Sequence, residues 1–126
     1  MKIISSSDAP KAIGPYSQAI RAGKWLYTSG QVGLDPATGE LVSADFAAQV
    51  RRAFDNLKAV LTEAEMQFSD VVKATVYLTD MANFQTMNGI YSEYFGDHKP
   101  ARTTIAAAGL PKGALVEIDL VARDGK

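Results

Sequence analysis

The most constraining feature of this sequence is a run of apolar residues that recur every three or four positions across residues 43–65. Charged residues fall on the opposite side of the same run. This spacing predicts one long amphipathic helix that packs a single face on a flat partner. Ser43 or Asp45 can cap its first turn. The apolar stripe consists of Phe46, Val50, Phe54, Leu57, Leu61 and Ala64.

A second, shorter stripe predicts another helix over residues 82–95, and Gly96 suits the left-handed conformation that commonly ends a helix. Between the helices, residues 70–80 alternate in polarity and predict a strand with Val72 and Ala74 on one face. The stripe of the second helix consists of Phe84, Met87, Tyr91, Tyr94 and Phe95. Further strands are expected at residues 2–4, on either side of Ala22-Gly23-Lys24, and near residues 103–107 and 115–122.

This order of elements predicts an α+β fold in two layers, with two helices on one face of a sheet, in a single domain over residues 1–126. The last two strands are expected to pair as a hairpin about Pro111, which would bring Glu117 opposite residues near Ile105. The other sheet face would be too apolar for water alone, so association with another copy is expected. That face is expected to carry Val71, Lys73, Thr75, Tyr77, Glu117, Asp119 and Val121.

Composition excludes several classes of function. The 13 basic and 14 acidic residues are nearly balanced and scattered, which argues against a nucleic-acid partner. The chain has no cysteine, so disulfides and thiolate nucleophiles are ruled out, and its one histidine, His98, leaves no His-rich metal site. A Ser-His-Asp triad would have to use His98, in a loop beside Pro100, and is not favoured.

Other motifs are also missing from the sequence. The segment SGQVG lacks the Lys-Ser/Thr and the following helix of a phosphate-binding loop. No apolar run approaches about 18 residues, so no membrane span is expected. The first residues lack the apolar core of a signal peptide, and a soluble, cytoplasmic protein is therefore the expectation.

Two charged residues on strand patterns are candidates for chemistry. Arg102 begins a strand whose same-face neighbours, Thr104 and Ala106, leave room beside a guanidinium that can bind a carboxylate through paired hydrogen bonds. A solvated arginine at a strand edge, or a partner for a nearby aspartate, is the alternative. Glu117 lies between Val116 and Ile118, and a polar outer sheet face is the alternative explanation for it.

Three other polar residues are less informative taken singly. Asn88 lies at the edge of the second helix's apolar stripe, where its amide needs partners. It serves either a binding site or a structural hydrogen bond to a neighbouring loop. Tyr16 either lines a site or is an ordinary core residue. Ser29, at a strand end, either lines a site or is an ordinary turn residue.

In combination these segments resemble the RidA/YjgF family of reactive-imine deaminases. The resemblance runs from about Ile3 to Ala122 and rests on IGPYSQAI, LYTSGQVGLDPATGEL, NLKAVLTEA, MNGIYSEYF and PARTTIAAAGLPKGALVEIDLVA. It implies a chorismate-mutase-like fold and a homotrimer whose sheets line a central barrel, with active sites between subunits. It also implies hydrolysis of 2-imino acids, such as 2-iminopropanoate and 2-iminobutanoate, to 2-keto acids and ammonia, with no metal or organic cofactor.

The resemblance also implies roles for individual residues. Arg102 matches the arginine that binds the substrate carboxylate, and Glu117 matches the acid that activates the attacking water. The chain departs from many relatives at Thr104, where cysteine is common, and at Asp119, where glutamate is commoner. Other positions that match site-lining residues are Tyr16, Ser29, Gly30, Asn88 and Thr104.

The resemblance leaves alternatives to catalysis open. A non-catalytic regulator or chaperone would use the same pocket to bind small carboxylates. A ribonuclease is less favoured because the charge is neutral and a pair of histidines is missing. The preferred imine is not fixed by the sequence.

Overall fold

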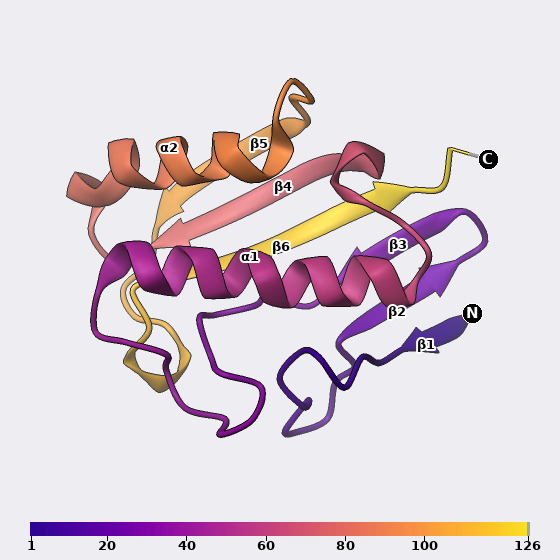
Figure 1. Cartoon of the computed structure of the whole chain (residues 1–126), viewed down its shortest axis with the longest axis horizontal. Coiled ribbons are helices and arrows are strands. Elements are labelled where there is room, and N and C mark those ends of the chain that lie inside the picture. Colours follow the sequence, from indigo (N-terminus) through magenta and orange to yellow (C-terminus); the bar gives the residue numbers. More distant parts are fainter. Residues whose placement is uncertain (126) are drawn as a thin grey trace.

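The computed structural model describes residues 1–125, in which six strands form one mixed sheet. The strand order is β1-β2-β3-β6-β4-β5, and both α-helices lie on one face of the sheet (Figure 1). This confirms the predicted two-layer α+β fold. The elements are β1 (Lys2–Ile4), β2 (Ala19–Ala22), β3 (Trp25–Thr28), α1 (Phe46–Glu63), β4 (Val71–Leu78), α2 (Phe84–Phe95), β5 (Ala101–Ala106) and β6 (Val116–Arg123), with short 3₁₀ helices at Phe68–Asp70, Met81–Asn83 and Pro111–Gly113.

The helix α1 forms where the apolar stripe predicted it, although it is shorter at both ends than expected. Asp45 is its cap, since one carboxylate oxygen accepts a hydrogen bond of 2.9 Å from the backbone N–H of Ala48. The Ser43 hydroxyl instead accepts from the N–H of Asp45. All six predicted stripe residues are buried.

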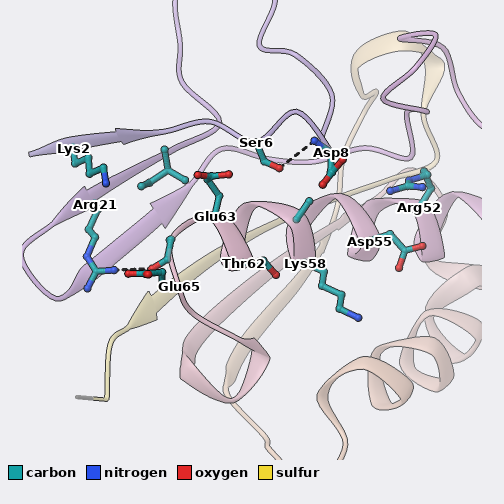
Figure 2. A pocket seen from close by; sticks show the side chains of 13 residues that line it. Lys2, Ser6, Asp8, Arg21, Arg52, Asp55, Lys58, Thr62, Glu63 and Glu65 are labelled. Atoms are coloured by element: carbon teal, nitrogen blue, oxygen red, sulfur yellow. Dashed lines mark hydrogen bonds between the residues drawn. The ribbon is translucent and has the colours of Figure 1, made fainter.

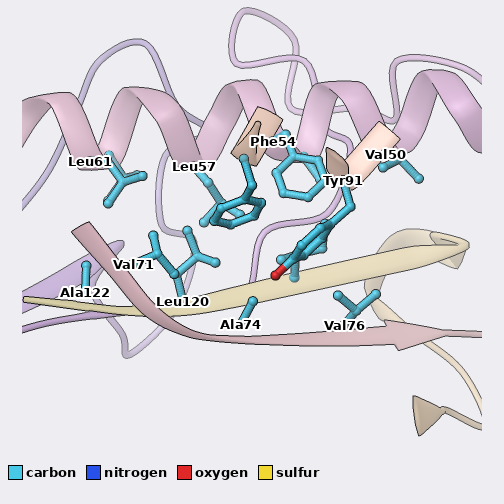
Figure 3. Packing of buried hydrophobic residues seen from close by; sticks show 14 of the residues in the cluster. Val50, Phe54, Leu57, Leu61, Val71, Ala74, Val76, Tyr91, Leu120 and Ala122 are labelled. Carbon is cyan, nitrogen blue, oxygen red and sulfur yellow. The ribbon is translucent and has the colours of Figure 1, made fainter. Parts of the chain in front are cut away.

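An aromatic cluster joins α1 to α2 above the sheet. The Phe54 ring stacks on Tyr94 at 4.7 Å between centroids and contacts Tyr91 edge-on at 5.8 Å. Figure 3 shows Phe54 and Tyr91 packed over Ala74. This packing confirms the stripe of the second helix, and Gly96 ends that helix with the expected positive φ of 60°.

The start of β4 differs from the simple alternation of the sequence. A bulge between Val71 and Lys73 shifts the register, so Val71 is 1% exposed on the helix face and Val72 is 40% exposed. The prediction that Val71 lies on the uncovered face and Val72 on the covered one is therefore wrong. An extra residue in one strand reverses which side chains face the core, and periodicity alone does not reveal it.

The pairing of the last two strands is also different from the predicted hairpin. β6 lies between β3 and β4, and β5 pairs in parallel with β4 at the sheet edge. The helix α2 causes this arrangement, because it carries the chain from the end of β4 back to its beginning, so that β5 runs in the same direction. Glu117 is consequently opposite Tyr77 of β4, and not opposite Ile105.

The face of the sheet away from the helices is uncovered and of mixed character, as expected. Tyr27 is 50% and Ile105 is 43% exposed there. The charged side chains of Glu117 and Asp119 lie among these apolar groups. Such a surface favours a partner that covers its apolar part.

Among the helices formed by residues 1–125, none combines the length and the apolar character needed to traverse a lipid bilayer.

Candidate functional site

The predicted site residues fall into two groups on opposite faces of the sheet. Arg102 is in register with Ala74, which is in turn in register with Leu120, and both are buried beneath the helices. Glu117 is in register with Tyr77 on the uncovered face. The predicted hairpin would have allowed Arg102 and Glu117 to approach each other within one chain, but the sheet itself separates them.

Arg102 lies against the aromatic face of α2. Its guanidinium carbon is 4.8 Å from the centroid of the Tyr91 ring and 5.6 Å from that of Phe84. No carboxylate in residues 1–125 lies within salt-bridge distance of it. Arg102 borders a depression of about 520 Å³ together with Asn88 and Tyr91. A half-buried guanidinium without a carboxylate partner is well suited to bind an anion.

Three polar atoms near Arg102 are buried without a hydrogen-bond partner in the described residues. They are Asn88 Oδ1, Tyr91 OH and Thr104 Oγ1. Asn88 and Tyr91 share the depression with Arg102, and Thr104 is two residues along the same face of β5. A buried polar group without a partner costs about 1–3 kcal/mol, so three together indicate a place where a polar molecule binds.

Two of these atoms bear on the predictions from sequence. The side-chain oxygen Oδ1 of Asn88 makes no hydrogen bond to a neighbouring loop in residues 1–125. This disfavours the alternative that Asn88 serves only as a structural hydrogen-bond partner. The sequence places Tyr91 only in the core stripe. Tyr91 nonetheless borders the depression, and a tyrosine within an apolar stripe carries no sequence signal that it lines a site.

The second group surrounds Glu117. A pocket of about 280 Å³ is lined by Tyr16, Gly30 and Glu117. A Cβ atom on residue 30 would lie 2.6 Å from Glu117 Cδ, so only glycine leaves space for this carboxylate. Tyr16 is 55% exposed, and it is therefore a surface residue of this pocket rather than a core residue.

The electrostatic surroundings of Glu117 favour its protonated form. Burial raises the pKa of Glu117, and the nearby negative charge of Asp119 raises it further. Burial also raises the pKa of Asp119, although hydrogen bonds from Tyr77 and Thr75 and the charge of Lys73 oppose this. The Tyr77 hydroxyl donates to Asp119 Oδ2 over 3.1 Å. A raised pKa makes the ionised carboxylate a stronger proton acceptor, which suits a general base.

Ser29 does not line either depression. Its hydroxyl donates to the carbonyl oxygen of Ser17 over 2.6 Å, and its N–H donates to the carbonyl of Gln18. These bonds attach the end of β3 to the loop that carries Tyr16. The Gln18 amide then holds the same loop, since it donates to the carbonyls of Ser6 and Pro10 and accepts from the N–H of Ser6. Gln18 cannot be recognised from the sequence, because one buried glutamine has no distinctive spacing.

His98 and the acidic residues form no metal site in the part of the chain that is described. The Nε2 atom of His98 lies 2.7 Å from the carbonyl oxygen of Val71, so the ring serves as a donor to the backbone. No group of three or more histidine, aspartate or glutamate side chains within residues 1–125 is arranged to hold a metal ion.

The family model described as endoribonuclease L-PSP matches residues 6–124. The chain belongs to the RidA/YjgF/L-PSP family. The 2-iminobutanoate/2-iminopropanoate deaminase of Homo sapiens is 45% identical over 124 residues, which cover 98% of this chain and 90% of the relative. The corresponding deaminase of Bos taurus is 47% identical, with the same coverage of both chains.

Solved structures of the RidA/YjgF/L-PSP family share the whole fold. The YjgF gene product of E. coli superposes with a TM-score of 0.93 at 41% identity and covers 98% of both chains. E. coli TdcF with bound serine gives a TM-score of 0.94 at 38% identity and covers 99% of this chain and 100% of that one. These matches confirm the chorismate-mutase-like fold that the sequence motifs implied.

A larger groove lies elsewhere on this RidA-family chain. A groove of about 890 Å³ runs between α1 and the strands β1 and β2, and Figure 2 shows its charged walls. Arg21 there is bound to Asp124 at 2.7 Å and to the carbonyl of Ala64. The groove contains none of the residues predicted for the site.

Proposed function

We propose that this protein is a hydrolytic deaminase that converts 2-imino acids and their enamine tautomers to 2-keto acids and ammonia. The observation that carries the proposal is the half-buried Arg102 guanidinium, which lacks a carboxylate partner in residues 1–125 and lies beside unpaired polar atoms. A small 2-imino acid brings the carboxylate that this arrangement lacks. Relatives at 45–47% identity carry the name 2-iminobutanoate/2-iminopropanoate deaminase, which supports this reaction.

The proposed active site forms between copies of the chain. Arg102 and Glu117 lie on opposite faces of one sheet, so they can meet only if a second copy supplies one of them. The uncovered sheet face, with its exposed apolar side chains, is the surface on which copies would pack. We propose a homotrimer in which Arg102, Asn88 and Thr104 of one copy face Tyr16, Gly30 and Glu117 of the next.

In this site the two charged residues have different tasks. Arg102 binds the carboxylate through a charge-assisted pair of hydrogen bonds, worth about 1.5–3 kcal/mol, and so fixes the imine carbon. Glu117 accepts a proton from water as the oxygen bonds to that carbon. With the imine nitrogen protonated at the outset, this step gives a neutral adduct that carries a hydroxyl and an amino group. The adduct collapses to the ketone when Glu117 returns its proton to the nitrogen and the hydroxyl proton leaves with the ammonia as ammonium. The reaction consumes one water and needs no redox partner.

The charge of the chain and the position of its one histidine argue against action on RNA. The net charge is −1, and the single histidine is bonded to the backbone of Val71. A nuclease site needs positive charge to hold the phosphate backbone and usually a general acid–base pair. We therefore propose no ribonuclease activity for this chain.

Substitution of the arginine tests the proposal. We expect Arg102→Ala to reduce imine hydrolysis by at least about a hundredfold, because both affinity and orientation are lost. The fold should survive, since Arg102 makes no salt bridge in residues 1–125. Arg123→Ala is the matched control, as this arginine is exposed beside Trp25. The assay traps remaining imine with semicarbazide after an amino acid oxidase has generated it.

The outcomes separate an enzyme from a binding protein. A fully active Arg102→Ala variant would refute the assignment of this residue. If the native protein accelerates imine loss only at stoichiometric amounts, the protein is a non-catalytic binder of small carboxylates or a chaperone. Turnover at catalytic amounts excludes that alternative.

Replacement of the acid tests the second role. Glu117→Gln should retain binding of a 2-keto acid by calorimetry but lower turnover by about 10²–10⁴-fold, because the amide cannot accept the proton. Unchanged turnover would count against Glu117 as the base.

A further inference from the structure

The pocket that holds Glu117 extends well beyond the carboxylate, and most of its extension is apolar. Three segments form its walls: the loop before β2, the segment after β3 and the 3₁₀ helix Pro111–Gly113. Glu117 and Gly30 are among the lining residues. The apolar lining consists of Pro10, Ile13, Tyr16, Val32, Leu34 and Pro111.

The size of this pocket exceeds what the smallest substrates require. Its volume is about 280 Å³, whereas an apolar cavity of about 150 Å³ already accommodates benzene. A single attacking water takes up only about 30 Å³. A substrate with a methyl or ethyl side chain would therefore leave much of the apolar wall in contact with solvent.

We infer that this pocket is the side-chain subsite of the enzyme and that it selects 2-imino acids with branched apolar or aromatic side chains. This inference rests on the proposed function. The imine carbon carries a carboxylate, a nitrogen and a side chain. In the proposed site, Arg102 of one copy binds the carboxylate and Glu117 of the next copy directs the water. The side chain of the substrate is then directed to the apolar wall beside Glu117.

The charges around the pocket are consistent with an apolar occupant. An acidic side chain would approach the carboxylate of Glu117, which lies among the lining residues. A basic side chain would approach Lys11 and Lys112. Both lysines are exposed, and Lys112 Nζ is 3.9 Å from a Glu40 oxygen, so their attraction for an acidic substrate is weak.

The test compares imines of different size with the native protein. An L-amino acid oxidase generates imines from alanine, leucine and phenylalanine, and semicarbazide reports the remaining imine. We expect kcat/KM for the leucine- and phenylalanine-derived imines to exceed that for the alanine-derived imine by about tenfold, because added methylene groups enter an apolar pocket.

Two variants locate the subsite. Ile13→Ala removes an apolar side chain that is 75% exposed, so the fold is not at risk. It should lower kcat/KM for the two large imines by about fivefold and leave the alanine-derived imine within about twofold. Leu34→Ala should show the same selectivity with a larger effect. Ile3→Ala, at a residue 66% exposed on β1, is the matched control and should change nothing.

Each result has a distinct meaning. Equal losses for large and small imines in both variants, or a native preference for the alanine-derived imine, overturn the subsite while the deaminase activity stands. Absence of hydrolysis for every imine overturns the proposed function, and the subsite with it.

Discussion

At the scale of single residues, Gly30 shows how closely the backbone is fitted to the candidate base. Gly30→Ala would place a Cβ 2.6 Å from Glu117 Cδ, so the glutamate side chain must turn away. We expect imine turnover to fall by about 10²-fold, since the proton acceptor leaves its position. Free energy of unfolding should change by less than about 1 kcal/mol, because a flexible side chain can yield.

Gly39→Ala is not a suitable control, since its φ of 74° strains any other residue. Gly89→Ala, in open space on α2, is the better comparison and should retain activity. Full turnover by Gly30→Ala would show that the observed position of Glu117 is unimportant for the reaction.

The pair of carboxylates on β6 gives a prediction on pH dependence. Asp119 raises the pKa of Glu117 through its negative charge. Glu117 must be ionised to act as a base, so kcat/KM falls as the pH drops through this pKa. Asp119→Asn removes the negative charge and lowers the pKa of Glu117. We therefore expect the acid limb of the pH–rate profile to move to lower pH.

The control for this experiment is Asp8→Asn, which removes an exposed carboxylate from a different region. It should leave the acid limb in place. A limb that moves to higher pH in Asp119→Asn would contradict the assigned direction of the electrostatic effect.

At the scale of elements, sequence periodicity predicted what each segment is but not which segment lies beside it. The stripes of α1 and α2 and the turn at Gly23 required only local spacing, and each was confirmed. The position of β6 between β3 and β4 depends on how α2 redirects the chain, which no local pattern encodes. Because local sequence patterns do not reveal this pairing, they do not reveal that the sheet separates Arg102 from Glu117.

The N-terminus of α1 provides a prediction on stability. Asp45→Ala removes the side chain that accepts a hydrogen bond from the N–H of Ala48. We expect a loss of about 1 kcal/mol in the free energy of unfolding, measured by urea denaturation with an unchanged m-value. Ser43→Ala should cost less, because the Ser43 hydroxyl accepts its hydrogen bond from the N–H of the cap residue and not from the helix. Equal losses would show that the cap is shared between the two.

At the scale of the whole molecule, the two groups of candidate residues lie on opposite faces of one sheet. The Arg102 group opens on the helix side, and the Glu117 group lies on the uncovered side. The motifs of the sequence indicate both groups of residues, but only the three-dimensional pairing of strands shows that they lie on opposite faces of the sheet. A single-copy enzyme would have no reason to separate its anion-binding group from its base in this way.

The proposed assembly can be tested by mixing two variants that we expect to be inactive on their own. Arg102→Ala retains Glu117, and Glu117→Gln retains Arg102. If the copies are unfolded together and refolded at equal amounts, a site is intact only when the retained Arg102 of one copy faces the retained Glu117 of the next. In a randomly mixed trimer this holds for about one quarter of the sites, so about a quarter of native turnover should return. Each variant refolded alone is the control. No recovery, in mixtures shown by mass spectrometry to contain both variants, would mean that both residues act within one copy or that the site has been misassigned.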